Sequence, residues 1–169
     1  MPTERFLDSC IAEHDRYGGG SVMVWGGCWN EGKTGAVVVQ GNLNGQRYVD
    51  DIVIPVIAPA IAERNLTLQQ DNAKPHTCRV TMNAFAANNI PRLHWPARSP
   101  DLSPIEHVWD IMQRDLLENY AVPTSLQQLA EQVVHAWTSV SQAAIQNLIA
   151  SMPRRIEECI ERGGGHTHY

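Results

Sequence analysis

The order of apolar patterns along this chain predicts an α/β protein with a mixed sheet and a helical C-terminal flank. Two glycine-bounded runs rich in Val or Trp come first, extended and helical patterns then alternate, and only helical spacing follows residue 103. The chain has 169 residues, of which 43% are hydrophobic, and this suits one domain with a sizeable core. We therefore expect a single domain over residues 1–169, with the helical flank at about 124–162.

The first two apolar runs predict a β-hairpin. Ser21–Trp29 and Gly35–Gly41 are rich in Val or Trp, and Glu31-Gly32 lies between them as a turn. Because Val37–Val39 is unbroken, we expect that strand to be buried on both faces. The first seventeen residues mix charges with isolated apolar positions and predict no element.

The middle of the chain alternates between helical and extended patterns. Gln46–Ala62 has helical spacing, and Pro55 and Pro59 predict a kink or two short helices within it. Three shorter elements are predicted next: a strand at Leu66–Asp71, a helix at Thr77–Asn88 and an extended piece at Ile90–Trp95.

The rest of the chain predicts a proline-rich loop followed by helices. Residues 96–104 contain three prolines, after which Ser103 as N-cap and Pro104 as the first helical residue predict a helix start. Apolar faces predict three further helices, around Leu126–Trp137, Ile145–Met152 and Pro153–Ile160.

Charge and composition exclude several classes of protein. The formal charge is −5, so the chain is not expected to bind DNA non-specifically on its own. No apolar run reaches the ~20 residues of a membrane helix, and the sequence opens with no signal-peptide pattern. The four cysteines are scattered without a C-x-x-C pair, which indicates a reducing compartment, cytosol or nucleus.

Asp71 and Glu106 are the candidates for chemistry. Asp71 follows a strand, where open α/β sheets present ligands, and Glu106 lies in the first turn of a helix after a stiff loop. Two such carboxylates can hold a divalent metal that activates a water and stabilises a phosphoryl leaving group. Each also has a structural interpretation. Asp71 suits an Asx-turn or a helix cap, and Glu106 completes a capping box that begins at Ser103.

Other polar features are weaker candidates. His76 is either a substrate or metal contact or an ordinary loop histidine. Gly18–Gly20 lacks the Lys-Ser/Thr of a phosphate loop, so no nucleotide cofactor is expected. His166 and His168 form only a weak metal pattern. Four tryptophans are expected in the core: Trp25, Trp95, Trp109 and Trp137.

Four dense motifs occur in order along the chain. They are SVMVWGG at 21–27, QQDNAKPHT at 69–77, WPARSPDLSPIEHVWD at 95–110 and SMPRRIEECIERGGGHTHY at 151–169. Together they resemble the Tc/mariner superfamily of cut-and-paste DNA transposases, from about Glu4 to the last residue. Thirty-four residues lie between Asp71 and Glu106, as in the branch whose third acid is Glu.

The resemblance implies a ribonuclease H-like fold with an Asp-Asp-Glu triad that binds two Mg²⁺ (or Mn²⁺) ions. By this resemblance Asp71 is the second acid and Glu106 the third, and Asn72 and His76 are second-shell or DNA-contacting positions. The implied chemistry is hydrolysis at transposon ends, followed by attack of the freed 3′-hydroxyl on target DNA. The implied partners are DNA, as transposon ends and target, and a second copy of the chain; a membrane is not among them.

The sequence departs from this family at its N-terminal end. The family's first acid lies on the first strand, upstream of the Gly-Gly-Gly-Ser segment, and Asp8, Glu13 and Asp15 do not occupy the matching position. We therefore expect an N-terminally truncated domain that lacks the first strand and the helix-turn-helix region. Without that strand, neighbouring strand edges should be exposed unless a partner or the chain's own N-terminal residues fill the gap.

These expectations define a leading hypothesis and an alternative. The leading hypothesis is a fragment of a DDE-type transposase catalytic domain that acts in the nucleus and is inactive alone, because the first Asp is missing. The alternative is a non-catalytic remnant or recruited domain that acts in DNA or protein interaction. A stand-alone ribonuclease H-like hydrolase is disfavoured, because that chemistry needs the same missing acid.

Overall fold

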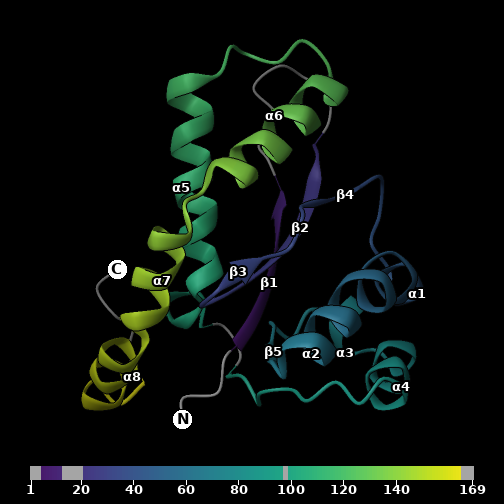
Figure 1. The fold of residues 1–169 in the computed structure, drawn as a ribbon, viewed down its shortest axis with the longest axis vertical. Helices are drawn as coiled ribbons and strands as arrows, with labels where there is room; N and C mark the ends of the chain where they lie inside the picture. Colours follow the sequence, from purple (N-terminus) through teal and green to yellow (C-terminus); the bar gives the residue numbers. More distant parts are fainter. Residues whose placement is uncertain (1–4, 13–20, 97–98, 165–169) are drawn as a thin grey trace.

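The computed structural model describes residues 5–12, for which it gives the backbone, and residues 21–96 and 99–164. Its centre is a mixed sheet whose strands are ordered β3-β2-β1-β5, with β4 also pairing with β2 (Figure 1). The five strands are β1 (Arg5–Ala12), β2 (Met23–Trp29), β3 (Gly32–Lys33), β4 (Val37–Val39) and β5 (Thr67–Gln69).

The central strand is made by the chain's own N-terminal residues. Strand β1 pairs antiparallel with β2 and parallel with β5, with Leu7 opposite Cys28 on one side and Gln69 on the other. The sequence predicts that the family's first strand is absent, and β1 occupies the gap that its absence would leave between β2 and β5. The backbone edges expected to be exposed there are thus hydrogen-bonded within the chain.

Helices cover both faces of the sheet. On one side lie α1 (Gly45–Tyr48), the π-helix η1 (Val49–Ile57), α2 (Ala58–Arg64), α3 (Lys74–Thr77) and α4 (Arg79–Ala87). After the short 3₁₀ turn η2 (Pro100–Leu102), the other side carries α5 (Pro104–Asn119), α6 (Leu126–Ser139) and α7 (Gln142–Ala150), and α8 (Met152–Glu161) follows.

Two hydrophobic clusters, one on each face of the sheet, show which strand side chains point to which layer of helices. Trp25 and Leu68 belong to the cluster with η1, α2 and α4. Cys28 belongs to the other cluster, together with Trp109 of α5 and Trp137 of α6. Because neighbouring residues of a strand point to opposite faces, this assignment gives the direction of every residue in β2 and β5.

Several elements differ locally from their predictions. The prolines of residues 46–62 do not break the helix; the run continues as α1, η1 and α2, with Pro55 inside the π-helical part. The helix predicted at Thr77–Asn88 is divided at Cys78, whose backbone is extended. Only one bridge, Leu68 to Arg92, forms in the piece predicted as extended at Ile90–Trp95.

Strand β4 is less buried than its unbroken valine run predicts. Val37 and Val38 are only half-buried, since β4 pairs with β2 alone among the described strands, although its residues contact both hydrophobic clusters. Among the described residues, no helix is long and apolar enough to span a membrane.

Candidate active site

A cleft of about 390 Å³ lies between the end of β5 and the start of α5. One wall is residues 69–73, and the other includes Ser99, Pro100, Ser103 and Glu106, with Trp95 and Pro96 beside them. The cleft therefore brings Asp71 and Glu106 together, although thirty-four residues separate them in the sequence.

The alternation of β5 explains why Asp71 faces this cleft. Leu68 is buried in the cluster under α2, and Gln70 accepts a hydrogen bond from Tyr48 Oη at the same face, at 2.8 Å. Gln69 therefore points to the opposite face of β5, and Asp71, two residues after it, lines the same cleft.

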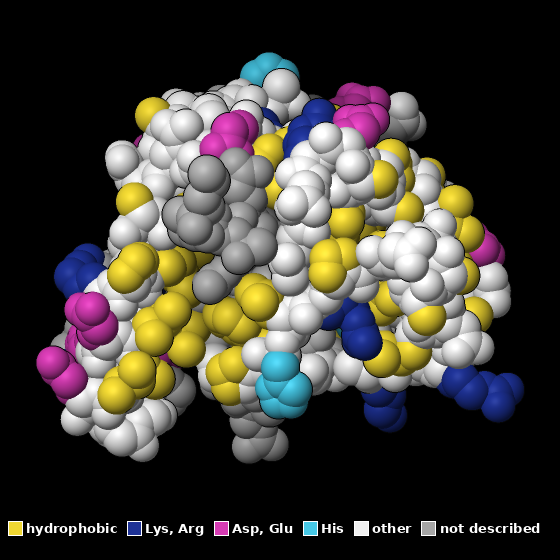
Figure 2. Space-filling model, turned by 60° about the horizontal axis from the view of Figure 1, so that its bottom comes forward, with side chains coloured by type: hydrophobic (Ala, Val, Ile, Leu, Met, Phe, Trp, Pro, Cys, Tyr) yellow, Lys and Arg dark blue, Asp and Glu magenta, His cyan; other side chains and the backbone are white. Residues whose placement is uncertain are grey.

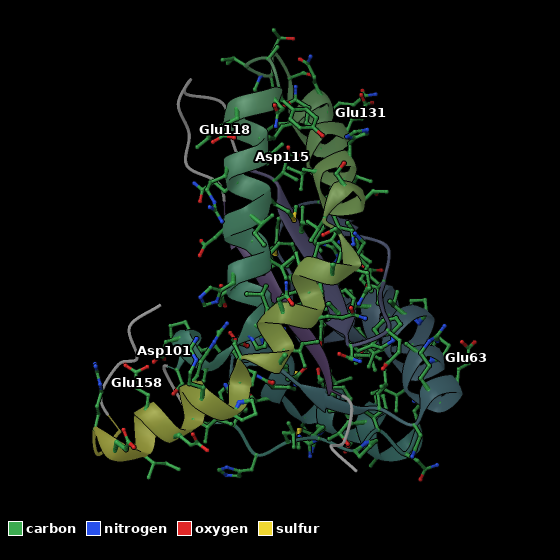
Figure 3. The ribbon with its side chains drawn as sticks, turned by 60° about the vertical axis from the view of Figure 1, so that its left-hand side comes forward. Glu63, Asp101, Asp115, Glu118, Glu131 and Glu158 are labelled. Carbon is green, nitrogen blue, oxygen red and sulfur yellow. The ribbon has the colours of Figure 1, made fainter. Side chains whose placement is uncertain are left out.

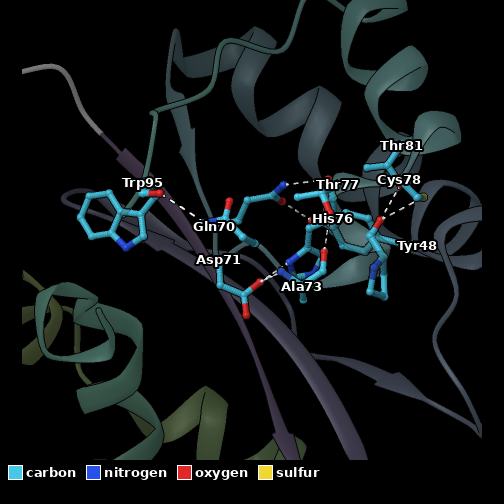
Figure 4. Close-up of polar contacts among 11 residues, drawn as sticks. Tyr48, Gln70, Asp71, Ala73, His76, Thr77, Cys78, Thr81 and Trp95 are labelled. Atoms are coloured by element: carbon cyan, nitrogen blue, oxygen red, sulfur yellow. Dashed lines mark hydrogen bonds and ion pairs between the residues drawn. The ribbon is translucent and has the colours of Figure 1, made fainter. Parts of the chain in front are cut away.

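The carboxylate of Asp71 is held by two hydrogen bonds on one oxygen. Its Oδ1 lies 2.6 Å from His76 Nδ1 and accepts the Ala73 backbone N–H at 3.0 Å (Figure 4). The His76 bond, and then the Ala73 bond, lower the pKa of Asp71 below its ordinary value, whereas burial opposes them. The Ala73 bond is the Asx-turn foreseen as the structural interpretation. Both bonds use Oδ1, and 68% of the side chain is exposed, so Asp71 is ionised and accessible from the cleft.

His76 is fixed by the layer beneath Asp71. It is 2% exposed, and its ring lies 4.5 Å from the Tyr48 ring between centroids. Gln70 links both, because its Oε1 accepts from Tyr48 and its Nε2 donates to the His76 carbonyl at 3.3 Å (Figure 4). An ionised carboxylate only accepts hydrogen bonds, so His76 Nδ1 carries the proton.

Asn72 connects the two sides of the cleft. Its Nδ2 donates to the Trp95 carbonyl at 3.3 Å, while its side chain is exposed. Trp95 is half-buried and lines the cleft, so the prediction that it is a core residue is wrong, whereas Trp25, Trp109 and Trp137 are buried as predicted.

Glu106 enters the cleft from the first turn of α5. The helix begins at Pro104 with Ser103 as N-cap, as predicted, and the Glu106 N–H donates to the Ser103 carbonyl at 3.2 Å. The Ser103 side chain makes no capping hydrogen bond, so its half of the predicted capping box is not formed. A carboxylate in this turn is stabilised by the positive end of the helix dipole.

The donors in the cleft suit a hard divalent cation. Mg²⁺ and Mn²⁺ prefer carboxylate and amide oxygens. Besides the two acids, the cleft is lined by Gln69, whose buried Oε1 has no hydrogen-bond partner among the described residues.

No described acid other than Asp71 and Glu106 lines the cleft. Figure 3 shows Asp115 and Glu118 along α5, Glu131 on α6 and Glu63 on α2. In the described ranges, no group of three or more His, Cys, Asp or Glu side chains could hold a metal. Among the described side chains, the cleft therefore contains two carboxylates, those of Asp71 and Glu106.

Comparison with known proteins identifies the family. A family profile described as DDE superfamily endonuclease matches residues 9–129. The chain belongs to the DDE superfamily endonucleases. Within that family it is a Tc/mariner transposase domain. It is 37% identical over 159 residues to the Tcb1 transposase of Caenorhabditis briggsae, and 33% identical over 156 residues to the Tc3 transposase of Caenorhabditis elegans.

These relatives are much longer than this DDE domain. The matches cover 91% and 90% of this chain, but 56% of the Tcb1 transposase and 47% of the Tc3 transposase. The chain thus spans about half the length of the curated relatives it matches.

Solved structures confirm the ribonuclease H-like fold. The catalytic domain of Mos1 mariner transposase is 18% identical, with a TM-score of 0.82 over 97% of this chain and 84% of that one. A Mos1 strand transfer complex matches with a TM-score of 0.79 at 17% identity, over 98% of this chain and 56% of that one.

Strand β1 carries one acid, Asp8. Asp8 pairs with Gly27 across the sheet, and continuing the β1–β5 register by two residues places Ser9 level with Asp71. Glu13, Asp15, Gly18–Gly20, His166 and His168 lie outside the described residues.

Three residues of the site were not predicted from the sequence. Gln69 could have been found, because the alternation of Leu66–Asp71 places it on the same face as Asp71. Tyr48 and Gln70 carried no such signal, since their roles depend on the packing of α1 against the end of β5.

Proposed function

We propose that this DDE domain holds a divalent metal between Asp71 and Glu106 and contributes that site to DNA cleavage and strand transfer in cut-and-paste transposition. The observation that carries the proposal is the convergence of these two carboxylates in one cleft, from a strand end and a helix start. Mos1 catalytic domain structures with Mn and with Mg support the choice of metal.

Asp71 and Glu106 would hold Mg²⁺ or Mn²⁺ in the cleft. When bound, the metal lowers the pKa of a coordinated water and stabilises the leaving oxygen of a phosphodiester. We propose two ions for the complete site, in which a further acid from another segment supplements these two carboxylates.

The protein's own residues would orient these ligands. His76 Nδ1 and the Ala73 amide hold Asp71 Oδ1, and neither of these bonds occupies Oδ2. Asn72 joins the β5 loop to Trp95, so the wall that carries Asp71 is tied to the segment that leads into α5. We assign Asn72 and His76 to this positioning role; His76 is too buried to contact DNA directly.

We propose DNA as the partner, with a second copy of the chain in a paired complex in the nucleus. Mos1 paired-end complexes with a transposon end support this proposal. The charge of −5 argues that most of the attraction to DNA comes from another part of the protein. Figure 2 agrees: on the face it shows, Lys and Arg lie singly or in small groups rather than in a continuous band.

A recruited, non-catalytic domain is the second candidate. It is favoured by one observation, the register that places Ser9 rather than an acid level with Asp71. The two candidates share the same fold and differ in whether the cleft binds metal and cleaves DNA.

Metal binding tests the proposal directly. Isothermal titration of the 169-residue domain with Mn²⁺ should show binding that Asp71→Asn and Glu106→Gln each weaken by at least tenfold, since each removes a charged ligand. Asp115→Asn, on the same helix as Glu106 but at its far end, is the matched control and should bind as the parent does. Unchanged binding in both cleft variants would refute the assignment.

A further inference from the structure

Gln69 is an unusual residue for the strand in which it lies. It follows the core residue Leu68 in β5 and is 2% exposed, yet its Oε1 has no hydrogen-bond partner among the described residues. A buried amide oxygen without a partner destabilises a fold, and an apolar side chain of the same length would avoid that cost.

The position of Gln69 places it at the floor of the candidate active site. It lies two residues before Asp71 on the same face of β5, and it lines the cleft that both acids line. Strand β1 runs beside it, with Leu7 at the paired position. Its Oε1 is buried, and the residue is one of those that line the cleft.

The chemistry of an amide oxygen matches the acids around it. Carboxamide oxygens are ligands of hard divalent cations, and they add no charge to a site that already carries two carboxylates. The last torsion of a glutamine side chain is soft, so the amide can turn its oxygen toward the cleft. Oε1 itself makes no hydrogen bond among the described residues, so none of its own holds it in its present direction.

We infer that Gln69 is a third, neutral oxygen ligand of the divalent cation held by Asp71 and Glu106. This rests on the proposed function, because it assumes that the cleft binds metal. It explains why a strand otherwise packed on apolar neighbours keeps a buried glutamine at this position. It also gives the cleft a neutral oxygen ligand beside the strand-end carboxylate and the helix-start carboxylate, which line the same cleft.

In Gln69→Met, the melting temperature and the Mn²⁺ affinity are expected to change in opposite directions, so a loss of metal binding cannot be explained by a loss of stability. Gln69→Met keeps the length of the side chain and removes the amide. The metal-free melting temperature should rise by about 2–4 °C as the unpaired oxygen is lost, while Mn²⁺ affinity should fall about tenfold or more. Gln69→Glu, which adds a third carboxylate, should melt lower without metal and bind Mn²⁺ more tightly than the parent.

Gln142→Met is the matched control. Gln142 Nε2 donates to the carbonyls of Trp29 and Asn30, far from the cleft, so this variant should lose stability and keep its Mn²⁺ affinity. Far-UV circular dichroism checks that each variant is folded.

The outcomes distinguish this inference from the proposed function. Parental Mn²⁺ affinity in Gln69→Met, with binding lost in Asp71→Asn and Glu106→Gln, overturns the role of Gln69 and leaves the proposed function standing. Parental affinity in the two acid variants overturns the proposed function, and this inference with it. If Gln69→Met does not fold, Gln69→Glu decides, because weaker or equal Mn²⁺ binding there contradicts the inference.

Discussion

At the scale of single residues, the main feature of the cleft is a hydrogen bond between an exposed side chain, Asp71, and a buried one, His76. Asp71 presents most of its side chain to solvent, whereas His76, bonded to it, is almost completely buried against Tyr48. The buried ring fixes the exposed carboxylate in place and favours its ionised form. An aspartate at a loop end would otherwise sample several rotamers.

The first prediction concerns this pair. Asp71 has a lowered pKa in the folded state, so it contributes stability above its ordinary value of 3.8, and that contribution is lost as the pH falls through the folded pKa. His76→Phe keeps a ring beside Tyr48 and removes the Nδ1 donor. The pKa of Asp71 should therefore rise to its ordinary value or above, because burial still raises it while the largest lowering cause is gone.

Carbon-13 NMR of the Asp71 carboxyl during a pH titration measures this shift. The exposed His94 supplies the control, since His94→Phe should leave the Asp71 titration unchanged. A pKa that stays low in His76→Phe would mean that the Ala73 amide alone holds the carboxylate.

At the scale of elements, the site is positioned by close contacts between segments distant in sequence. Lys33 Nζ donates to the carbonyls of Trp137, Thr138 and Val140, which satisfies the end of α6 and ties it to β3. On the other face, α1 approaches α3 and α4 closely at Gly45, where an added Cβ would lie 2.0 Å from Cys78 Sγ. This approach places Tyr48 against His76.

The second prediction follows from the close contact between Gly45 and Cys78. Gly45→Ala should destabilise the domain by about 1–3 kcal/mol, because the new methyl group overlaps Cys78 and forces α1 away. Urea denaturation measures the loss. Gly35→Ala is the matched control, because a Cβ at Gly35 meets nothing within 4 Å.

A double variant makes this prediction sharper. Cys78→Ala in the Gly45→Ala background removes the nearest atom and should recover part of the lost stability, although Val80 Cγ1 remains 3.1 Å from the new Cβ. No recovery would show that the clash lies elsewhere.

At the scale of the whole molecule, strand β1 decides both the stability and the chemistry of the domain. By pairing with β2 and β5 it completes the sheet that the sequence predicts to be open. It adds no acid to the site at the position opposite Asp71, because the continued β1–β5 register pairs Asp71 with Ser9. Closing a sheet requires only backbone hydrogen bonds, whereas two-metal chemistry requires a carboxylate at one particular position.

The third prediction concerns activity. The 169-residue chain should neither nick nor join DNA with terminal inverted repeats, in Mg²⁺ or Mn²⁺, because two carboxylates leave at least one ion under-liganded. A fusion in which the first strand and helix-turn-helix region of a complete relative replace residues 1–12 should recover cleavage in a gel assay, because β1 otherwise holds the place of that strand. Asp71→Asn or Glu106→Gln in that fusion should abolish cleavage and preserve repeat binding.

The register of β1 supplies the internal control for this prediction. Ser9→Asp puts an acid level with Asp71 and should strengthen Mn²⁺ binding, whereas Asp8→Asn should not weaken it. Cleavage by the unmodified chain that is lost in Glu106→Gln would contradict inactivity. Asp8, Glu13 and Asp15 would then be the acids to replace.

The elements that have local causes could be predicted from the sequence. The hairpin of β2 and β4 follows from Val-rich runs bounded by glycines, and α5 begins at Pro104 because Ser103 and two nearby prolines stop any earlier helix. The motifs around Asp71 and Glu106 also identified the family and marked these two acids as candidates, since motif order and spacing are properties of the chain alone.

The contacts between distant segments could not be predicted from local patterns. No local pattern places Arg5–Ala12 between β2 and β5, because strand pairing depends on which backbone edges remain free after the rest has folded. The packing of His76 against Tyr48 and the position of Gln69 in the cleft of the two acids likewise depend on segments that are distant in sequence. Sequence patterns report the face of one element, whereas a site is made by the faces of several.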